Sequence, residues 1–216
     1  GKYCSPGLQL LYGACFQRFP DKPAFTRRGE LIRLADWRHR VGERLVAPLA
    51  RAAVKGHLHP NALSGLGFFH SLLAGAFAAQ GSWPLAGLLI LVAGLFDLLD
   101  GAVARAKGQT SLFGAVLDST LDRLGEAALL LGLWVFFIQG GSMAGTLLVY
   151  ASLVGSVLVS YIKARAEGLG LSCNVGIFTR AERVILLAIG LFSGQVIIAL
   201  AIVALLSFVT AGQRLY

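Results

Sequence analysis

Four aspartates in the middle of the chain are the residues best suited to chemistry. Asp97 and Asp100 are three positions apart, and Asp118 and Asp122 are four positions apart. On a helix each pair shares one face, because residues at these spacings are neighbours on the helix surface. Both pairs lie within strongly apolar sequence, where carboxylates are costly and by default mark a functional site.

Four converging carboxylates need a cation, since their mutual repulsion is large in a medium of low dielectric. Oxygen donors favour a hard divalent ion, so we predict that all four aspartates bind Mg²⁺, with Mn²⁺ as the alternative. Two ions would provide the clamp that is used in phosphoryl displacement. Two other interpretations stay open on charge alone: buried salt bridges to Arg105, Lys107 and Arg123, or a proton or cation relay in a transporter.

The elements that carry these aspartates are predicted to cross a membrane. Of the 216 residues, 56% are hydrophobic and 14% are charged, whereas about a quarter of the residues of a soluble domain are charged. Six apolar runs, each near the ~20 residues that span a bilayer, cover 62–80, 83–105, 112–139, 143–163, 177–193 and 195–212. We therefore predict an all-α, polytopic membrane protein with six transmembrane helices.

The basic residues predict the orientation. All 19 Lys and Arg residues lie on the side of the two termini or in the helical turns next to it. The three short connections on the other side carry none. The positive-inside rule then places both termini in the cytoplasm and the six helices in the cell membrane. The excess of positive charge therefore indicates membrane topology, and we expect no nucleic acid as a partner.

The sequence divides into three parts. Residues 1–33 have no assignable structure, and residues 57–216 form the membrane domain. Between them, residues 34–56 have apolar side chains at helical spacing, such as Leu34, Trp37 and Val41, with arginines largely off that stripe. This pattern predicts an amphipathic juxtamembrane helix, which would lie on an anionic membrane surface or pack on its own membrane domain.

The spacing around the aspartates matches a known motif. Residues 97–105 read DLLDGAVAR; eight residues later, 114–122 read GAVLDSTLD. The segment resembles the signature DxxDGxxAR-x8-GxxxDxxxD of the CDP-alcohol phosphotransferase family at all of its fixed positions. The resemblance implies six transmembrane helices, a homodimer and an enzyme that transfers a phosphatidyl group from CDP-diacylglycerol to an acceptor hydroxyl, releasing CMP.

The resemblance also implies roles for individual residues. Asp97, Asp100 and Asp118 would be metal ligands, and Asp122 would lie at the metal centre and act as the general base. The residues that would contact CDP-diacylglycerol are Asn61, Ser64, Gly101, Arg105 and Ser111. For Asn61 and Ser64, which follow Pro60, capping of the first transmembrane helix is an equally good interpretation.

The acceptor is predicted from the second half of the chain. Residues 160–167, SYIKARAE, and 180–183, RAER, resemble the actinobacterial-type phosphatidylinositol phosphate synthases of this family, which use myo-inositol 1-phosphate. An anionic polyol phosphate needs a basic site, for which the candidates are Lys163, Arg165, Arg180, Arg183 and Arg214. The same residues could instead be ordinary positive-inside anchors. The alternatives are a phosphatidylglycerophosphate synthase, which takes glycerol 3-phosphate, and a cation transporter.

Overall fold

The computed structural model describes residues 59–108, 111–171, 173 and 175–216. The segment 1–33 and the predicted juxtamembrane helix at 34–56 lie outside this part of the chain. The described helices are α3 (Pro60–Ala79), α4 (Trp83–Lys107), α5 (Leu112–Gln139), α6 (Met143–Gly168), α7 (Arg180–Ser193) and α8 (Val196–Leu215). Within the described ranges there is no strand, so the predicted all-α class is confirmed.

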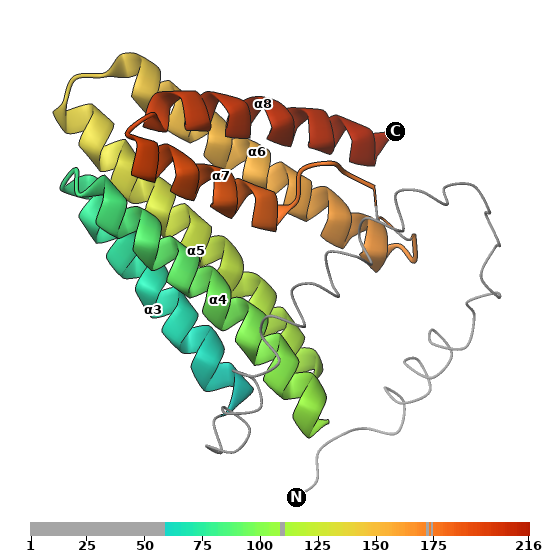
Figure 1. The fold of residues 1–216 in the computed structure, drawn as a ribbon. Coiled ribbons are helices and arrows are strands. Elements are labelled where there is room, and N and C mark those ends of the chain that lie inside the picture. Colours follow the sequence, from blue (N-terminus) through green and yellow to red (C-terminus); the bar gives the residue numbers. More distant parts are fainter. Residues whose placement is uncertain (1–58, 109–110, 172, 174) are drawn as a thin grey trace, which may run out of the picture.

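The helices form two groups that lie side by side (Figure 1). In the first group α3 packs against α4 and α5, and in the second group α8 packs against α6 and α7. Contacts of α4 with α7 and of α5 with α6 join the groups. The three short connections lie at one end of the assembly, and the start of α3, the end of α4 and the start of α7 lie toward the other (Figure 1).

Local sequence signals explain where several helices begin and end. The Ser111 hydroxyl accepts a hydrogen bond from the Gly114 amide at the start of α5, and Ser142 caps α6 in the same way. At α7 the Glu182 carboxylate accepts from the Thr179 amide at 2.8 Å. These contacts satisfy amides that have no partner within the helix. Because of the Thr179 cap, α7 starts at Arg180 and not at residue 177, where the apolar run begins.

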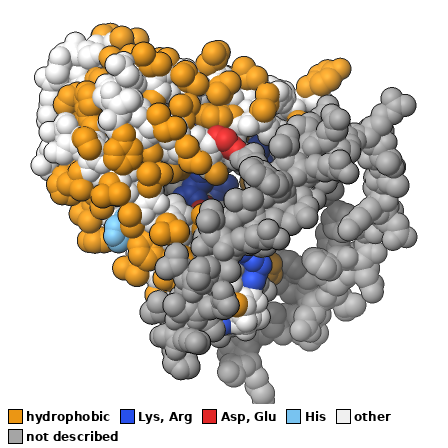
Figure 2. Space-filling model, in the orientation of Figure 1, with side chains coloured by type: hydrophobic (Ala, Val, Ile, Leu, Met, Phe, Trp, Pro, Cys, Tyr) orange, Lys and Arg blue, Asp and Glu red, His pale blue; other side chains and the backbone are white. Residues whose placement is uncertain are grey.

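Among the described helices, four are long and apolar enough to cross a membrane: α3, α4, α6 and α8. By contrast, α7 has 14 residues, and α5 carries Asp118, Asp122 and Arg123 in its first half and Glu126 at its middle. Large apolar side chains are exposed on all six described helices, and Figure 2 shows hydrophobic side chains over a large part of the described surface in that view. The protein is therefore a membrane protein, since a surface of this kind is stable only in lipid.

Glycines allow α3 and α5 to approach closely. A Cβ atom on Gly132 of α5 would lie 1.9 Å from the carbonyl oxygen of Gly75, and a Cβ on Gly75 would lie 2.3 Å from that of Ala128. Both distances are far below van der Waals contact, so only a residue without a side chain fits. Small residues at helix crossings are typical of membrane proteins, where close backbone packing replaces the hydrophobic effect.

We therefore expect Gly75→Ala to destabilise the protein by about 1–3 kcal/mol, the usual cost of overpacking. The added methyl group must push α3 away from α5. Thermal unfolding in detergent measures this effect. The matched control is Gly65→Ala on the same helix, where a Cβ would meet nothing within 4 Å. Equal unfolding temperatures for the two variants would contradict this account of the α3–α5 contact.

Candidate active site

The two pairs of aspartates come together between α4 and α5, as predicted from their spacing. Among the described residues, Asp97, Asp100 and Asp118 form a group that could hold a metal ion, with carboxylate oxygens all within 4.8 Å of one another. The last turns of α4 and the first turns of α5 supply them. This arrangement offers oxygen donors only, which suits a hard divalent cation.

Helix α3 supports this group through Ser64. The side-chain hydroxyl of Ser64 donates a hydrogen bond to the Asp100 carboxylate, and the residue lies one turn into α3, where the helix begins at Pro60. Asp100 is only 5% exposed, so its carboxylate is held in a fixed place. The sequence assigned Ser64 to the CDP moiety or to a helix cap, and the contact with Asp100 is a third role that spacing alone did not reveal.

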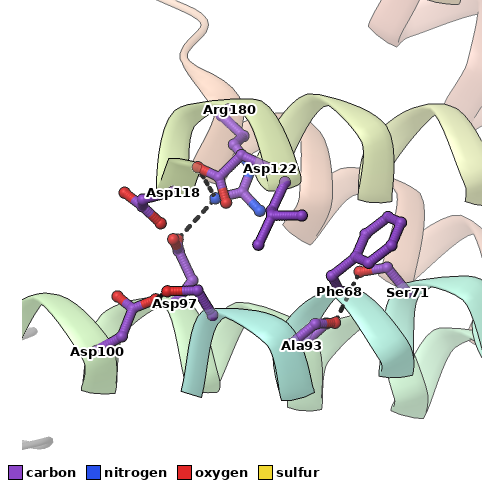
Figure 3. Close-up of a pocket in the computed structure, with 11 residues that line it drawn as sticks. Phe68, Ser71, Ala93, Asp97, Asp100, Asp118, Asp122 and Arg180 are labelled. Atoms are coloured by element: carbon purple, nitrogen blue, oxygen red, sulfur yellow. Dashed lines mark hydrogen bonds and ion pairs between the residues drawn. The ribbon is translucent and has the colours of Figure 1, made fainter. Parts of the chain in front are cut away.

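Asp122 has a different partner. Nη1 of Arg180, the first residue of α7, lies 2.6 Å from Oδ2 of Asp122 and 2.7 Å from Oδ2 of Asp97. Figure 3 shows the guanidinium reaching between the two carboxylates, with Asp118 and Asp100 further along the cluster. Arg180 therefore joins the aspartates of α4 and α5 to α7.

Within the described part of the chain, two larger cavities border the aspartates, one beside Asp100 and Asp118 and the other beside Asp97 and Asp122. The smaller has a volume of about 180 Å³ and includes Asp100 and Asp118 in its wall. It is lined by all five residues predicted to contact CDP-diacylglycerol: Asn61, Ser64, Gly101, Arg105 and Ser111. Gly101 keeps this wall open, because a Cβ atom there would approach only Nη1 of Arg105, at 3.4 Å.

The larger cavity has a volume of about 600 Å³ and includes Asp97 and Asp122 in its wall. Four predicted acceptor residues line it: Lys163, Arg180, Arg183 and Arg214. Its remaining wall is largely apolar and comes from α4 and α7, with Leu91, Leu95, Leu98, Val184 and Ile185. Figure 2 shows basic side chains recessed on the face in view, with hydrophobic side chains of the described part beside them.

The basic residues differ in their surroundings. Arg165 is exposed and is not among the residues that line the larger cavity, because it lies two positions after Lys163 and points elsewhere on α6. Arg214 donates from Nε to the Val175 carbonyl at 2.9 Å and from Nη1 to the Val159 carbonyl at 2.6 Å. It therefore ties the segment before α7 and the second half of α6 to the end of α8.

Arg183 is buried in an ion pair that the sequence did not predict. Its Nε and Nη2 atoms lie 2.7 and 2.8 Å from the two carboxylate oxygens of Glu126. A signal was present in the spacing, since Glu126 follows Asp122 by one helical turn and Arg183 follows Arg180 by one turn.

A carboxylate cluster between membrane helices, with a cavity beside each pair of aspartates, is typical of a membrane-embedded functional site. One cavity is bordered by the helix ends of α3 and α5, and the other is strongly basic. Both features favour phosphate-bearing ligands.

Comparison with known proteins agrees with a site for such ligands. Residues 57–211 match the family model described as CDP-alcohol phosphatidyltransferase. The chain belongs to this family, as the motif around the aspartates predicted, and it is a transferase.

Relatives within the family are named for inositol phosphate lipids. The archaetidylinositol phosphate synthase of Methanothermobacter thermautotrophicus is 39% identical over 155 residues, which are 69% of this chain and 77% of the relative. The phosphatidylinositol phosphate synthase of Mycobacterium tuberculosis, solved with CDP-DAG bound, has a TM-score of 0.72 and 31% identity over 80% of this chain and 92% of that one. A second structure of that enzyme, in complex with manganese and citrate, has a TM-score of 0.71 and 32% identity over 78% and 86% of the two chains.

Proposed function

We propose that the protein transfers the phosphatidyl group of CDP-diacylglycerol to myo-inositol 1-phosphate and releases CMP. The observation that carries this proposal is the basic cavity beside Asp122, on the opposite side of the aspartates from the cavity of the predicted CDP contacts. A reaction between a nucleotide-linked donor and an anionic acceptor needs two such sites that meet at one reacting phosphorus. The names of the relatives support the same reaction.

The donor would bind with its CDP moiety in the smaller cavity. Ser111 and Asn61 lie at its rim and offer polar groups to the nucleotide, while Gly101 allows close approach to the backbone of α4. Arg105 lies one turn beyond Gly101 and would contact a phosphate. The acyl chains would stay in the bilayer, which the exposed apolar side chains beside the site can accommodate.

The aspartates fit a divalent cation, because three carboxylates with oxygens within 4.8 Å would otherwise repel one another. We propose Mg²⁺ as this ion, with Asp97, Asp100 and Asp118 as its ligands. When bound, such an ion neutralises charge on the diphosphate and on the departing CMP. A second ion beside Asp122 would have to displace the guanidinium of Arg180 from its place between Asp97 and Asp122, so we propose it only for the substrate-bound state.

In the transfer step the acceptor hydroxyl forms a bond to the phosphorus that carries diacylglycerol. The bond from this phosphorus to the bridging oxygen breaks, and CMP leaves with that oxygen. Asp122 would accept the proton of the attacking hydroxyl, a role that requires it to face the acceptor cavity. Lys163, Arg180, Arg183 and Arg214 would hold the phosphate of the acceptor, and Arg165 would act at the rim of the site.

We also propose the membrane arrangement that the sequence predicts. All six helices would cross the cell membrane of a homodimer, with the termini and the site facing the cytoplasm. The charged first half of α5 would lie at the site and its apolar second half in the hydrocarbon. Helix α7 spans about 21 Å at 1.5 Å per residue, and the apolar residues Ile177 and Phe178 before it would add length within the bilayer. Residues 34–56 would form the juxtamembrane helix that precedes this domain.

The test is CMP release by the purified protein with CDP-diacylglycerol and Mg²⁺ and one acceptor at a time. We expect turnover with myo-inositol 1-phosphate to exceed that with glycerol 3-phosphate or free myo-inositol at least about a hundredfold. Either of these two other compounds would leave charged or polar groups of the binding site unpaired. Turnover with glycerol 3-phosphate alone would contradict myo-inositol 1-phosphate as the acceptor, and it would leave the family assignment intact. Equal turnover with free inositol would contradict the role of the basic cavity.

A further inference from the structure

The ion pair between Glu126 and Arg183 is buried and bidentate. The two side chains are 4% and 2% exposed, and Nε and Nη2 of Arg183 each lie within 2.8 Å of one carboxylate oxygen. Parallel hydrogen bonds of this kind fix the plane and rotation of a guanidinium, which a single contact cannot do. Glu126 therefore determines how Arg183 is oriented.

The pair repeats the contact at the aspartate cluster one turn further along both helices. Asp122 and Glu126 are one turn apart on α5, and Arg180 and Arg183 are one turn apart on α7. The pair of Asp122 with Arg180 lies at the reacting centre. The pair of Glu126 with Arg183 lies behind it, and Arg183 still forms part of the wall of the larger cavity.

One nitrogen of Arg183 has no partner among the described residues. Glu126 occupies Nε and Nη2, whereas Nη1 is buried and finds no hydrogen-bond acceptor within the part of the chain that the structure describes. A buried, charged donor without an acceptor is costly and calls for an explanation. In the wall of a basic cavity, an oxygen of an anionic ligand would supply the missing acceptor.

We propose that Glu126 is a positioning residue for the acceptor. By holding two nitrogens of Arg183, it directs the third nitrogen, Nη1, to the phosphate of the acceptor in the larger cavity. This inference rests on the proposed function, because it requires an anionic acceptor in that cavity. Glu126 itself does not touch the substrate.

The first test is Glu126→Gln, which preserves the size of the side chain but replaces one acceptor oxygen by an NH₂ group. We expect the KM for the acceptor phosphate to rise about tenfold, the effect of one charge-assisted hydrogen bond. The KM for CDP-diacylglycerol and kcat should stay within about threefold of wild type. A purely structural role would change both KM values together or would lower only the amount of folded protein.

A second variant keeps the test decisive if the unpaired Arg183 impairs folding. The double substitution Glu126→Leu with Arg183→Met replaces the buried ion pair by apolar groups of similar size, which is often neutral for stability. We expect this variant to fold and to show the same increase in acceptor KM. An acceptor KM equal to that of wild type, in either folded variant, would overturn the proposal.

Glu167→Gln is the matched control, because Glu167 pairs at 3.7 Å with Lys163, another cavity residue, but is half exposed. Its acceptor KM should stay within about threefold of wild type, as exposed ion pairs contribute little; a tenfold rise would contradict the selective role of Glu126. Turnover by the wild-type protein reports separately on the proposed function. If the wild type uses glycerol 3-phosphate, the same comparison is made with that acceptor.

Discussion

Replacement of Asp100 by Asn is expected to lower CMP release at least about a hundredfold and to raise the Mn²⁺ concentration needed for half-maximal activity. A metal ion contributes several kcal/mol to the transition state, and each 1.36 kcal/mol is a factor of about ten in rate. The substitution is conservative in shape, since the amide oxygen of Asn can still accept the hydrogen bond from Ser64. What it removes is the negative charge of one proposed metal ligand.

The measurement is CMP release as a function of Mn²⁺ concentration, after removal of bound ions with EDTA. Wild-type activity should vanish with EDTA and return with Mn²⁺ or Mg²⁺. The control is Thr120→Val on the exposed side of α5, whose hydroxyl donates a hydrogen bond to the Val116 carbonyl of its own helix at 2.7 Å. Activity of the wild type in EDTA, or an unchanged Mn²⁺ requirement of Asp100→Asn, would contradict a metal site at this cluster.

The fold followed from the sequence where hydropathy and spacing determine it. Helices α4 and α5 begin at Trp83 and Leu112, where the apolar runs begin. The ends differ where polar residues continue a helix beyond the membrane, and α6 runs to Gly168 and not to residue 163. There Lys163 and Glu167, four positions apart, lie on one face of the extended helix. Hydropathy reports the thickness of the bilayer and not the length of a helix.

The part of the site that depends on helical spacing within one motif, the aspartate cluster, was predictable from the sequence. The three aspartates of the metal group are close together because α4 and α5 are antiparallel and joined by a short segment. The partners from distant helices were not predictable in this way. Contacts of Asp122 with Arg180 and of Glu126 with Arg183 join α5 to α7. The matching one-turn spacings on the two helices are compatible with such contacts, but they do not predict that α5 and α7 approach each other.

Replacement of Asp122 by Asn is expected to reduce kcat by about 10²–10⁴, the usual contribution of a general base. The Asn side chain cannot accept a proton from the attacking hydroxyl. Binding of CDP-diacylglycerol should be retained, because Asp122 lies in the wall of the larger cavity and not in the wall of the smaller one. Single-turnover CMP release and a separate donor-binding assay distinguish the two effects.

Asp122 also holds Arg180 at 2.6 Å, so loss of activity alone would not establish the role of a base. Arg180→Lys separates the two roles, because it preserves the positive charge but loses the shape of the guanidinium. If Asp122 serves as the base, Arg180→Lys should raise the acceptor KM about tenfold with kcat nearly unchanged, while Asp122→Asn lowers kcat. If Asp122 only orients Arg180, both variants and the double variant should have the same kinetics. If the variants share these kinetics, a group other than Asp122 takes the proton of the attacking hydroxyl, and Asp122 serves only as the partner of Arg180.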